Sequence, residues 1–510
     1  EAGATETGAT ETGATETGAT AVPPPAPAAA QAPPNPFEGE AGRRVKRRAP
    51  PLDAPNPLPS ELALMRRARL GDSGMLEVTT PEGVRALTVD PVLQRQLTHV
   101  MASYRTPHAA AVVLDPSTGK VLAMAQHAHE APEDHGLPVR AAYPAASIFK
   151  IITASALVRH GLGPTTQECY DGGLRRISKR DLLSPGSRCA SLADAMGQST
   201  NVIFGKLTHQ HLTAAALREE AERFGFNRSI PFAIPVEPSE ARIPETAFAL
   251  AETGAGFGDV YLSPLHGALI ASTIANGGIW KDPILFESLP PLPGAVAETD
   301  APAQDALPVA GAAAALASSG TSAAETVAGK VAETTGEIRV APTADTDRLP
   351  PTAGASSTRT GGGEAPTAPL SVSESVAASA AAGGEVVRIM DAEHAAALAE
   401  MLEATVTRGT ARRVFAERGY RVEGAVGKTG TLADNRPFRD YSWFIGYAPK
   451  DNPRVAVAVV VVNDPIWHIR ATWLGREAMR LALARLEGEV AHVVSAAPMK
   501  VPVLTPEPLP

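Results

Sequence analysis

The stretch Ser147-Ile148-Phe149-Lys150 contains a serine and a lysine three residues apart, and it decides how the rest of the chain is interpreted. On a helix, residues three apart lie on one face, so the lysine amine can take the proton from the serine hydroxyl. Two further motifs follow at long intervals, Ser199-Thr200-Asn201 and Lys428-Thr429-Gly430-Thr431. Together, in this order, the three motifs indicate a serine nucleophile activated by a lysine.

Each motif alone has an ordinary structural explanation. The first can be a helix start followed by a surface lysine, the second an N-cap or turn, and the third a strand edge. The joint occurrence of the three motifs, each in a fitting predicted element, favours catalysis over three unrelated local features.

Composition divides the 510-residue chain into folded and low-complexity parts. Residues 1–80 begin with a Gly-Ala-Thr-Glu-Thr repeat, and residues 289–385 contain no Phe, Tyr or Trp. Such segments bury too little apolar surface to offset their ordering entropy. We therefore expect a mostly disordered N-terminal linker over 1–80, a disordered insertion over 289–385 and a flexible tail over 491–510. Residues 81–288 and 386–490 are long enough together for one two-lobed domain.

Net charge and hydropathy exclude several classes of protein. The formal net charge of −9 argues against a nucleic-acid binder. No apolar run reaches the length of a membrane span. The chain begins with Glu1 rather than Met, so a removed signal peptide or anchor is compatible with the sequence, but neither is visible in it.

Hydrophobic periodicity predicts the elements around the motifs. The predicted helices cover residues 91–104, with Asp90 as N-cap, and 148–158, 191–207, 212–224, 262–275, 392–406 and 468–486. The predicted strands cover residues 109–114, 121–124, 424–431, 441–448 and 455–462. This order predicts an α+β fold, with a five-stranded antiparallel sheet flanked by helices and an all-helical lobe beside it.

The chain resembles the transpeptidase domain of penicillin-binding proteins, over about 85–285 and 386–485. Beyond the three motifs, the resemblance rests on Leu87-Thr88-Val89-Asp90, Asp115-Pro116, Tyr143-Pro144-Ala145-Ala146, Ser263-Pro264-Leu265, Gly409-Thr410-Ala411 and Trp443-Phe444-Ile445-Gly446. One departure is Gly254-Ala255-Gly256, where the family often has Gln between the glycines. The implied fold is the α+β fold predicted above.

The resemblance implies the catalytic residues. Ser147 is expected to be the nucleophile, Lys150 its general base, and Ser199 a proton relay to the departing group. The base requires a pKa well below the usual value of about 10.4. Burial and the nearby cation Lys428 would lower it. The backbone N–H groups of Ser147 and Thr431 are expected to form an oxyanion hole.

The resemblance also implies the substrate-binding residues. Asn201 is expected to bond the peptide backbone of the substrate. Lys428 adds positive potential, while the hydroxyls of Thr429 and Thr431 receive the carboxylate of a D-alanine terminus. Gly430 lacks a side chain, so the strand can approach the nucleophile's helix closely.

The implied function is that of a peptidoglycan D,D-transpeptidase that cross-links stem peptides through a serine acyl-enzyme and is inhibited by β-lactams. The expected ligands are stem peptides ending in D-Ala-D-Ala and β-lactams, and no cofactor is expected. The alternatives are a D,D-carboxypeptidase or endopeptidase, a serine β-lactamase, and a non-catalytic β-lactam sensor. The short N-terminal region leaves no room for a glycosyltransferase domain, so a separate glycan polymerase is an expected partner. We expect an extracytoplasmic location.

Two cysteines, Cys169 and Cys189, lie between the first and second motifs, each beside turn-forming residues. We predict a disulfide between them, which suits an extracytoplasmic compartment. The alternative is two buried free thiols, and thiol counting separates the two.

A cluster of potential metal ligands precedes the nucleophile. Its members are His127, His129, Glu130, Glu133, Asp134 and His135. A solvated loop is favoured over a metal site, because no further ligands stand at fixed spacing on a predicted element. No metal is therefore expected.

Overall fold

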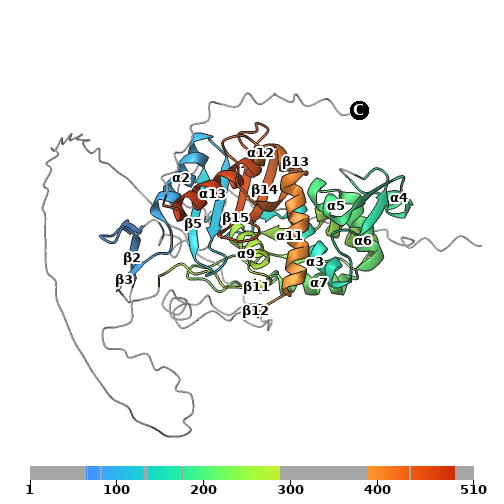
Figure 1. Ribbon diagram of the computed structural model, residues 1–510, viewed down its shortest axis with the longest axis horizontal. Coiled ribbons are helices and arrows are strands. Elements are labelled where there is room, and N and C mark those ends of the chain that lie inside the picture. The colour runs from blue at the N-terminus through green and yellow to red at the C-terminus, as the bar shows by residue number, and fades with distance from the viewer. Residues whose placement is uncertain are drawn as a thin grey trace, which may run out of the picture. The chain divides into compact units, whose positions relative to one another are not determined.

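The central sheet is built from strands that lie on both sides of the predicted insertion. Its five strands are antiparallel and lie in the order β13-β14-β15-β4-β5 (Figure 1). They are β4 (His108–Leu114), β5 (Val121–Ala128), β13 (Val426–Asn435), β14 (Phe438–Ala448) and β15 (Val455–Asn463). The predicted α+β fold with a five-stranded antiparallel sheet is confirmed.

This computed structural model describes residues 65, 67–80, 83–129, 136–173, 176–287, 387–435 and 438–488. All of them belong to one compact unit. The predicted insertion and tail lie outside the described residues, as does most of the predicted N-terminal linker. In the parts of the chain described here, no helix is long and apolar enough to cross a membrane.

Both faces of the sheet are buried, which explains why β15 is an almost unbroken apolar run. Alternate residues of a strand point to opposite faces. In β15, Val455, Val457 and Val459 belong to one hydrophobic cluster, whereas Ala456 and Ala458 belong to the other. The sheet therefore separates two cores, and each needs a covering layer of helices.

Helices supply these two layers. α2 (Pro91–Ser103) and α13 (Ala471–Leu486) pack on one face, and α9 (Pro264–Ala275) packs on the other. Asp90 caps α2 as predicted, because its carboxylate accepts hydrogen bonds from the backbone N–H groups of Val92 and Leu93 at 2.8 and 2.7 Å.

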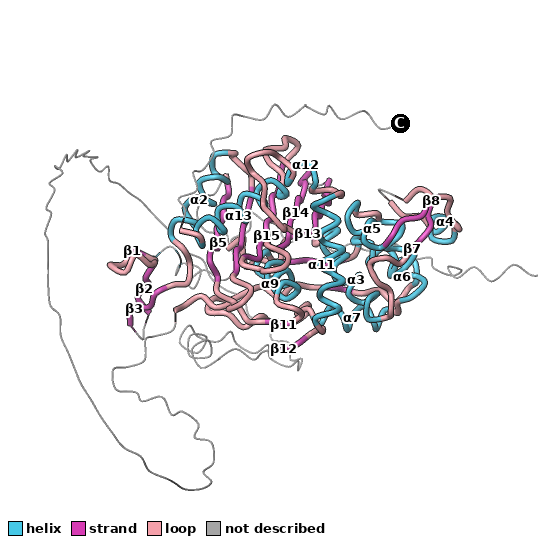
Figure 2. Tube along the Cα trace, in the orientation of Figure 1, coloured by secondary structure: helices cyan, strands magenta, loops and turns pink. Residues whose placement is uncertain are grey.

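A helical lobe lies beside the β13 edge of the sheet (Figure 2). Its helices are α3 (Lys150–Arg159), α4 (Lys179–Leu183), α5 (Leu192–Gln198), α6 (Asn201–His211), α7 (Ala214–Arg223) and α8 (Ala247–Glu252). The 3₁₀ turn η1 (Ala146–Phe149) and the wider π-helical turn η2 (Thr253–Phe257) belong to the same part of the chain, and two later helices, α11 (Ala392–Thr407) and α12 (Arg412–Phe415), complete it. The predicted all-helical lobe also carries a small hairpin, described below.

Two sequence predictions need correction. The single helix predicted over 191–207 is two helices, because Ser199 adopts a left-handed backbone conformation, with φ 56° and ψ 41°, that ends α5. The N-terminal linker predicted to reach residue 80 ends earlier. β1 (Arg69–Leu70) and β2 (Leu76–Thr80) pair with β3 (Gly83–Ala86) in a small sheet, where Val78 is buried against Leu87 and Val89.

Three other small sheets shape the domain. β6 (Tyr143–Pro144) and β9 (Ala241–Arg242) flank β10 (Asp259–Leu262), which orders the chain just before Ser147. β11 (Ile279–Trp280) pairs with β12 (Val387–Arg388), so a strand that precedes the predicted insertion is joined to one that follows it.

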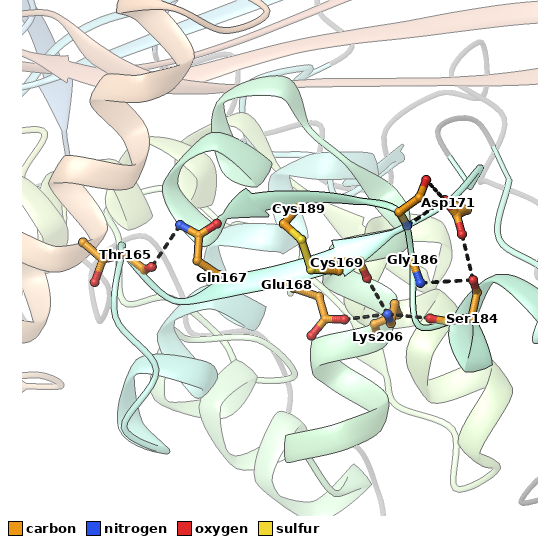
Figure 3. The surroundings of a disulfide bond; sticks show 10 residues. Thr165, Gln167, Glu168, Cys169, Asp171, Ser184, Gly186, Cys189 and Lys206 are labelled. Atoms are coloured by element: carbon orange, nitrogen blue, oxygen red, sulfur yellow. Dashed lines mark hydrogen bonds and ion pairs between the residues drawn. A yellow bond between two sulfur atoms is a disulfide. The ribbon is translucent and has the colours of Figure 1, made fainter.

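The fourth small sheet is the hairpin β7 (Gln167–Tyr170) and β8 (Arg188–Ser191), and it contains the predicted disulfide. Cys169 and Cys189 are directly opposite each other in the hairpin and are bonded (Figure 3). The buried Lys206 of α6 fixes the hairpin to the lobe. Its amine donates to the carbonyl oxygens of Cys169 and Ser184 at 2.5 and 2.9 Å and pairs with the Glu168 carboxylate at 2.6 Å (Figure 3).

The disulfide gives a first testable expectation. Thiol titration of denatured, unreduced protein should detect no free cysteine. Replacing both Cys169 and Cys189 by Ala should lower the free energy of unfolding by about 3 kcal/mol, the usual effect of opening a loop of this length. The measurement is denaturant unfolding with and without reductant. Two titratable thiols in the unreduced protein would contradict the bridge.

Candidate active site

The first and second motifs meet at Lys150. Ser147 lies in η1, which continues directly into α3, so that Ser147 and Lys150 are on the same side. The amine Nζ lies 2.8 Å from Ser147 Oγ, while Asn201 Oδ1 and the Ala255 carbonyl oxygen each accept from it at 2.7 Å. Lys150 is fully buried. All three of its hydrogen-bond partners are uncharged, so nothing in direct contact offsets the cost of burying its charge.

Electrostatics at Lys150 favour a neutral amine. Burial lowers its pKa well below the ordinary lysine value, and the positive charge of Lys428 lowers it further. A neutral amine has a lone pair that can accept the Ser147 proton. The site therefore holds a hydroxyl and a base in direct hydrogen-bond contact.

The second motif and the third meet at Lys428. Its amine donates to Ser199 Oγ at 3.0 Å and to the Thr429 carbonyl oxygen at 2.8 Å. Lys428 is also fully buried, and this burial lowers its pKa to about 7. The helix break at Ser199 is what brings the side chains of Ser199 and Asn201 to the two lysines, because Asn201 begins the next helix.

The register of β13 places the whole third motif on the edge strand of the sheet, opposite residues of β14. Lys428 and Gly430 pair with Ile445 and Trp443 and face the nucleophile. Thr429 and Thr431 alternate with them along the strand, and Thr431 is exposed. A Cβ atom at Gly430 would lie 3.1 Å from Cγ1 of Ile148. The strand therefore lies against η1 as closely as a glycine allows.

Backbone geometry behind Ser147 is equally tight. Ala146 has a left-handed φ of 50°, and Gly256 of η2, with φ 90°, lies against it. A Cβ atom at Gly256 would be 2.6 Å from the Ala146 carbonyl oxygen. The turn of η2 also directs the Ala255 carbonyl at Lys150. The two segments determine each other's position, and together they set the direction of the nucleophile.

A buried polar network holds α3 from behind. Ser155 Oγ lies 2.5 Å from a carboxylate oxygen of Glu220 on α7 and 2.8 Å from Nε2 of His394 on α11. Arg159 pairs with the same carboxylate at 2.8 Å. Burial is the main cause of a lowered pKa at His394. The network fixes the nucleophile's helix to two others without contacting the site itself.

The structure brings all eight predicted site residues to one place. Sequence reasoning missed two contributors. Thr410 Oγ1 lies 2.6 Å from Thr429 Oγ1, and its motif was noticed only as part of a resemblance. Ala255 contacts Lys150 through its backbone carbonyl, which every residue type has, so the sequence could not indicate this contact. The departure from the family pattern at Gly254-Ala255-Gly256 does not remove the contact, because the contact uses the backbone.

The predicted solvated loop before the nucleophile lies partly outside the described residues. His127 is on β5 and His129 follows it, whereas Glu130, Glu133, Asp134 and His135 are not described. Within the described ranges, no group of three or more metal-ligating side chains is present.

Comparison with known sequences identifies the family pattern. The family model for the penicillin binding protein transpeptidase domain matches residues 109–340 and 366–474. The peptidoglycan D,D-transpeptidase PbpA of Mycobacterium tuberculosis is 32% identical over 238 residues, which is 40% of this chain and 48% of that protein. The peptidoglycan D,D-transpeptidase MrdA of Haemophilus influenzae is 34% identical over 82 residues, 14% of this chain and 13% of that protein. The chain thus spans about half the length of the PbpA relative.

Solved structures share the fold. A peptidoglycan glycosyltransferase from Burkholderia ambifaria matches with a TM-score of 0.52 and 16% identity, over 80% of this chain and 99% of that chain. The D,D-transpeptidase domain of a peptidoglycan glycosyltransferase from Eggerthella lenta matches with a TM-score of 0.50 and 19% identity, over 82% and 95% of the two chains. At these identities the likeness establishes the fold alone.

The contact between Gly256 and Ala146 gives a second expectation. Gly256→Ala should lower the free energy of unfolding by roughly 2 kcal/mol more than Gly277→Ala, because overpacking is added to the backbone strain. Gly277 is a matched control, since its φ is also positive, at 62°, but no atom lies within 4 Å of a Cβ placed there. Urea unfolding measures both variants. Equal losses would show that the contact is not restrictive.

Proposed function

The chain belongs to the penicillin-binding protein transpeptidase family, and from that premise we propose that it is a peptidoglycan D,D-transpeptidase that cross-links stem peptides through an acyl-enzyme on Ser147. The observation that carries the proposal is the 2.8 Å contact between Ser147 Oγ and the buried amine of Lys150. This contact is the arrangement that nucleophilic catalysis requires.

Acylation uses the two lysines in different protonation states. Neutral Lys150 takes the hydroxyl proton as Ser147 Oγ attacks the carbonyl carbon of the penultimate D-alanine. The N–H groups of Ser147 and Thr431 stabilise the oxyanion. The peptide C–N bond then breaks, and the leaving D-alanine amine receives a proton through Ser199. Protonated Lys428 supplies positive potential, while Thr429 and Thr431 bind the substrate carboxylate. Asn201 binds the peptide backbone.

The second half-reaction transfers the acyl group to an amine. The acceptor nitrogen attacks the ester carbon, loses its proton to the same basic groups, and Ser147 Oγ leaves with a proton. Across the described part of the chain, no carboxylate contacts Ser147, Lys150, Ser199 or Lys428. The lack of an acidic group in contact supports an ester that survives until an amine arrives, which distinguishes a transpeptidase from a β-lactamase.

Location and partners belong to the same proposal. The Cys169–Cys189 disulfide supports an extracytoplasmic site of action, because such bonds persist in oxidising compartments. The natural ligands are stem peptides ending in D-Ala-D-Ala, and β-lactams are inhibitors that acylate the same serine. A separate glycan polymerase would supply the strands to be cross-linked.

Labelling by fluorescent penicillin tests the nucleophile. Ser147→Ala should abolish labelling, and Lys150→Ala should slow acylation by roughly 10²–10⁴-fold, the usual effect of a positioned base.

The penicilloyl ester should persist for minutes. With a D-Ala-D-Ala peptide, release of D-alanine should lead to cross-linked product when an amine is present. A penicilloyl adduct on a tryptic peptide other than the one with Ser147 would refute the assignment of the nucleophile. Rapid turnover of a β-lactam would indicate a β-lactamase. Hydrolysis of the acyl-enzyme despite added amine would indicate a carboxypeptidase.

The two lysines also predict the pH dependence of acylation. The rate should rise with pH as Lys150 loses its proton, because only the neutral amine is a base and its pKa is well below the ordinary lysine value. It should fall above pH about 7, where Lys428 loses the charge that attracts the substrate carboxylate. Stopped-flow acylation with a penicillin and with its methyl ester tests this expectation. The ester should lack the alkaline decrease, and an identical decrease with both compounds would rule out the role of Lys428.

A further inference from the structure

A small basic surface is built by the residues on either side of Thr410, whose hydroxyl contacts that of Thr429 in the candidate active site. Arg408, Gly409, Arg412, Arg413 and Ala416 line one pocket of about 380 Å³ at the end of α11 and along α12. No acidic side chain lines it.

The charge of this pocket is only partly compensated. The Arg408 guanidinium pairs with the Asp194 carboxylate at 2.7 Å. Arg412 and Arg413 are exposed, and neither has an acidic partner among the residues that the structure describes. Two unpaired guanidinium groups beside one concave surface suit an anionic ligand, and their planar shape suits a carboxylate in particular.

The pocket is held rigidly at both ends. At one end, the Thr410 N–H donates to the Gly197 carbonyl at 3.0 Å, and Thr410 Oγ1 contacts Thr429 Oγ1 at 2.6 Å. At the other end, the buried guanidinium of Arg476 donates to the Val414 carbonyl at 2.8 Å. The arginines thus stand on a backbone fixed to the strand that carries Thr429, so their distance from the site is set by the fold.

Reaction geometry indicates which part of the substrate passes this surface. In acylation the D-alanine nitrogen leaves the carbonyl carbon, and in transfer the acceptor nitrogen bonds to the same carbon. The entering and leaving nitrogens take the same position by microscopic reversibility. The leaving D-alanine carboxylate is assigned above to Thr429 and Thr431. A surface that continues from Thr429 is therefore on the acceptor side.

Resting on the function proposed above, we propose that Arg412 and Arg413 form an acceptor subsite that binds a carboxylate of the incoming amine-bearing peptide. The subsite makes no contact with the acylating group, so it affects which nucleophile resolves the ester rather than how the ester forms. A carboxylate-bearing acceptor then competes better with water than a neutral acceptor does.

The test compares two acceptors that differ only in charge, an amine peptide with free carboxylates and the same peptide with these carboxylates amidated. With wild-type protein, the ratio of cross-linked to hydrolysed product should be higher for the charged acceptor. The double variant Arg412→Ala/Arg413→Ala should lower that ratio about tenfold, the loss expected when a charge-assisted hydrogen bond is removed. The loss should appear as a raised KM for the acceptor.

Three controls make the result specific. Arg95→Ala removes an exposed arginine of α2 and should change nothing. Penicillin acylation of the double variant should match the wild type, and its ratio with the amidated acceptor should be unchanged. A slower acylation or an equal loss with both acceptors would overturn the proposal, because it would show that the arginines only position Thr410 and Thr429. An unchanged ratio with the charged acceptor would also overturn it.

Direct binding separates this proposal from the proposed function. Penicillin-acylated protein is titrated with the charged acceptor peptide, the amidated peptide and polyphosphate. Weaker binding of the charged peptide to the double variant supports the subsite even if the wild type forms no cross-link, which would refute only the transpeptidase assignment. Arginine-dependent binding of polyphosphate that is tighter than binding of the peptide would overturn the peptide assignment in favour of a phosphate polymer.

Discussion

Two buried lysines without a carboxylate partner are the constraint on which the site depends. Lys150 and Lys428 are both fully buried, and the hydrogen bonds to their amines come from hydroxyl, amide and carbonyl oxygens. Burying ammonium groups this way is unfavourable, so the pKa of each is lowered. The same cost favours the neutral form of the Lys150 amine, which is the form that acts as a base. A carboxylate within reach of either amine would stabilise its charge and remove the base.

The rest of the fold can be understood as the means of holding these amines in place. Lys150 is fixed by the nucleophile's helix, whose far end is bonded through Ser155 to Glu220 and His394. Lys428 is fixed by the edge strand of a sheet buried on both faces. Strand and helix approach closely because Gly430 has no side chain. A rigid surround of this kind keeps catalytic groups near their productive geometry.

Several of these features were predictable from local sequence. The valine-rich run of β15, the capping carboxylate of Asp90 and the spacing of Ser147 and Lys150 each act over a few residues, so periodicity and motif were enough. The helix break at Ser199 was not predictable in this way, because its left-handed backbone has no glycine to signal it. The early strand β2 was missed because its apolar residues are few and gain their burial from distant partners.

The sequence by itself determined the family and the α+β fold class and indicated the candidate site residues, because motifs and periodicity are written in neighbouring residues. Only the tertiary structure decided which contacts surround those residues. The carbonyl of Ala255 at Lys150 and the hydroxyl of Ser199 at Lys428 come from segments far apart in the chain. Their positions follow from backbone geometry and packing, which no single stretch of sequence encodes.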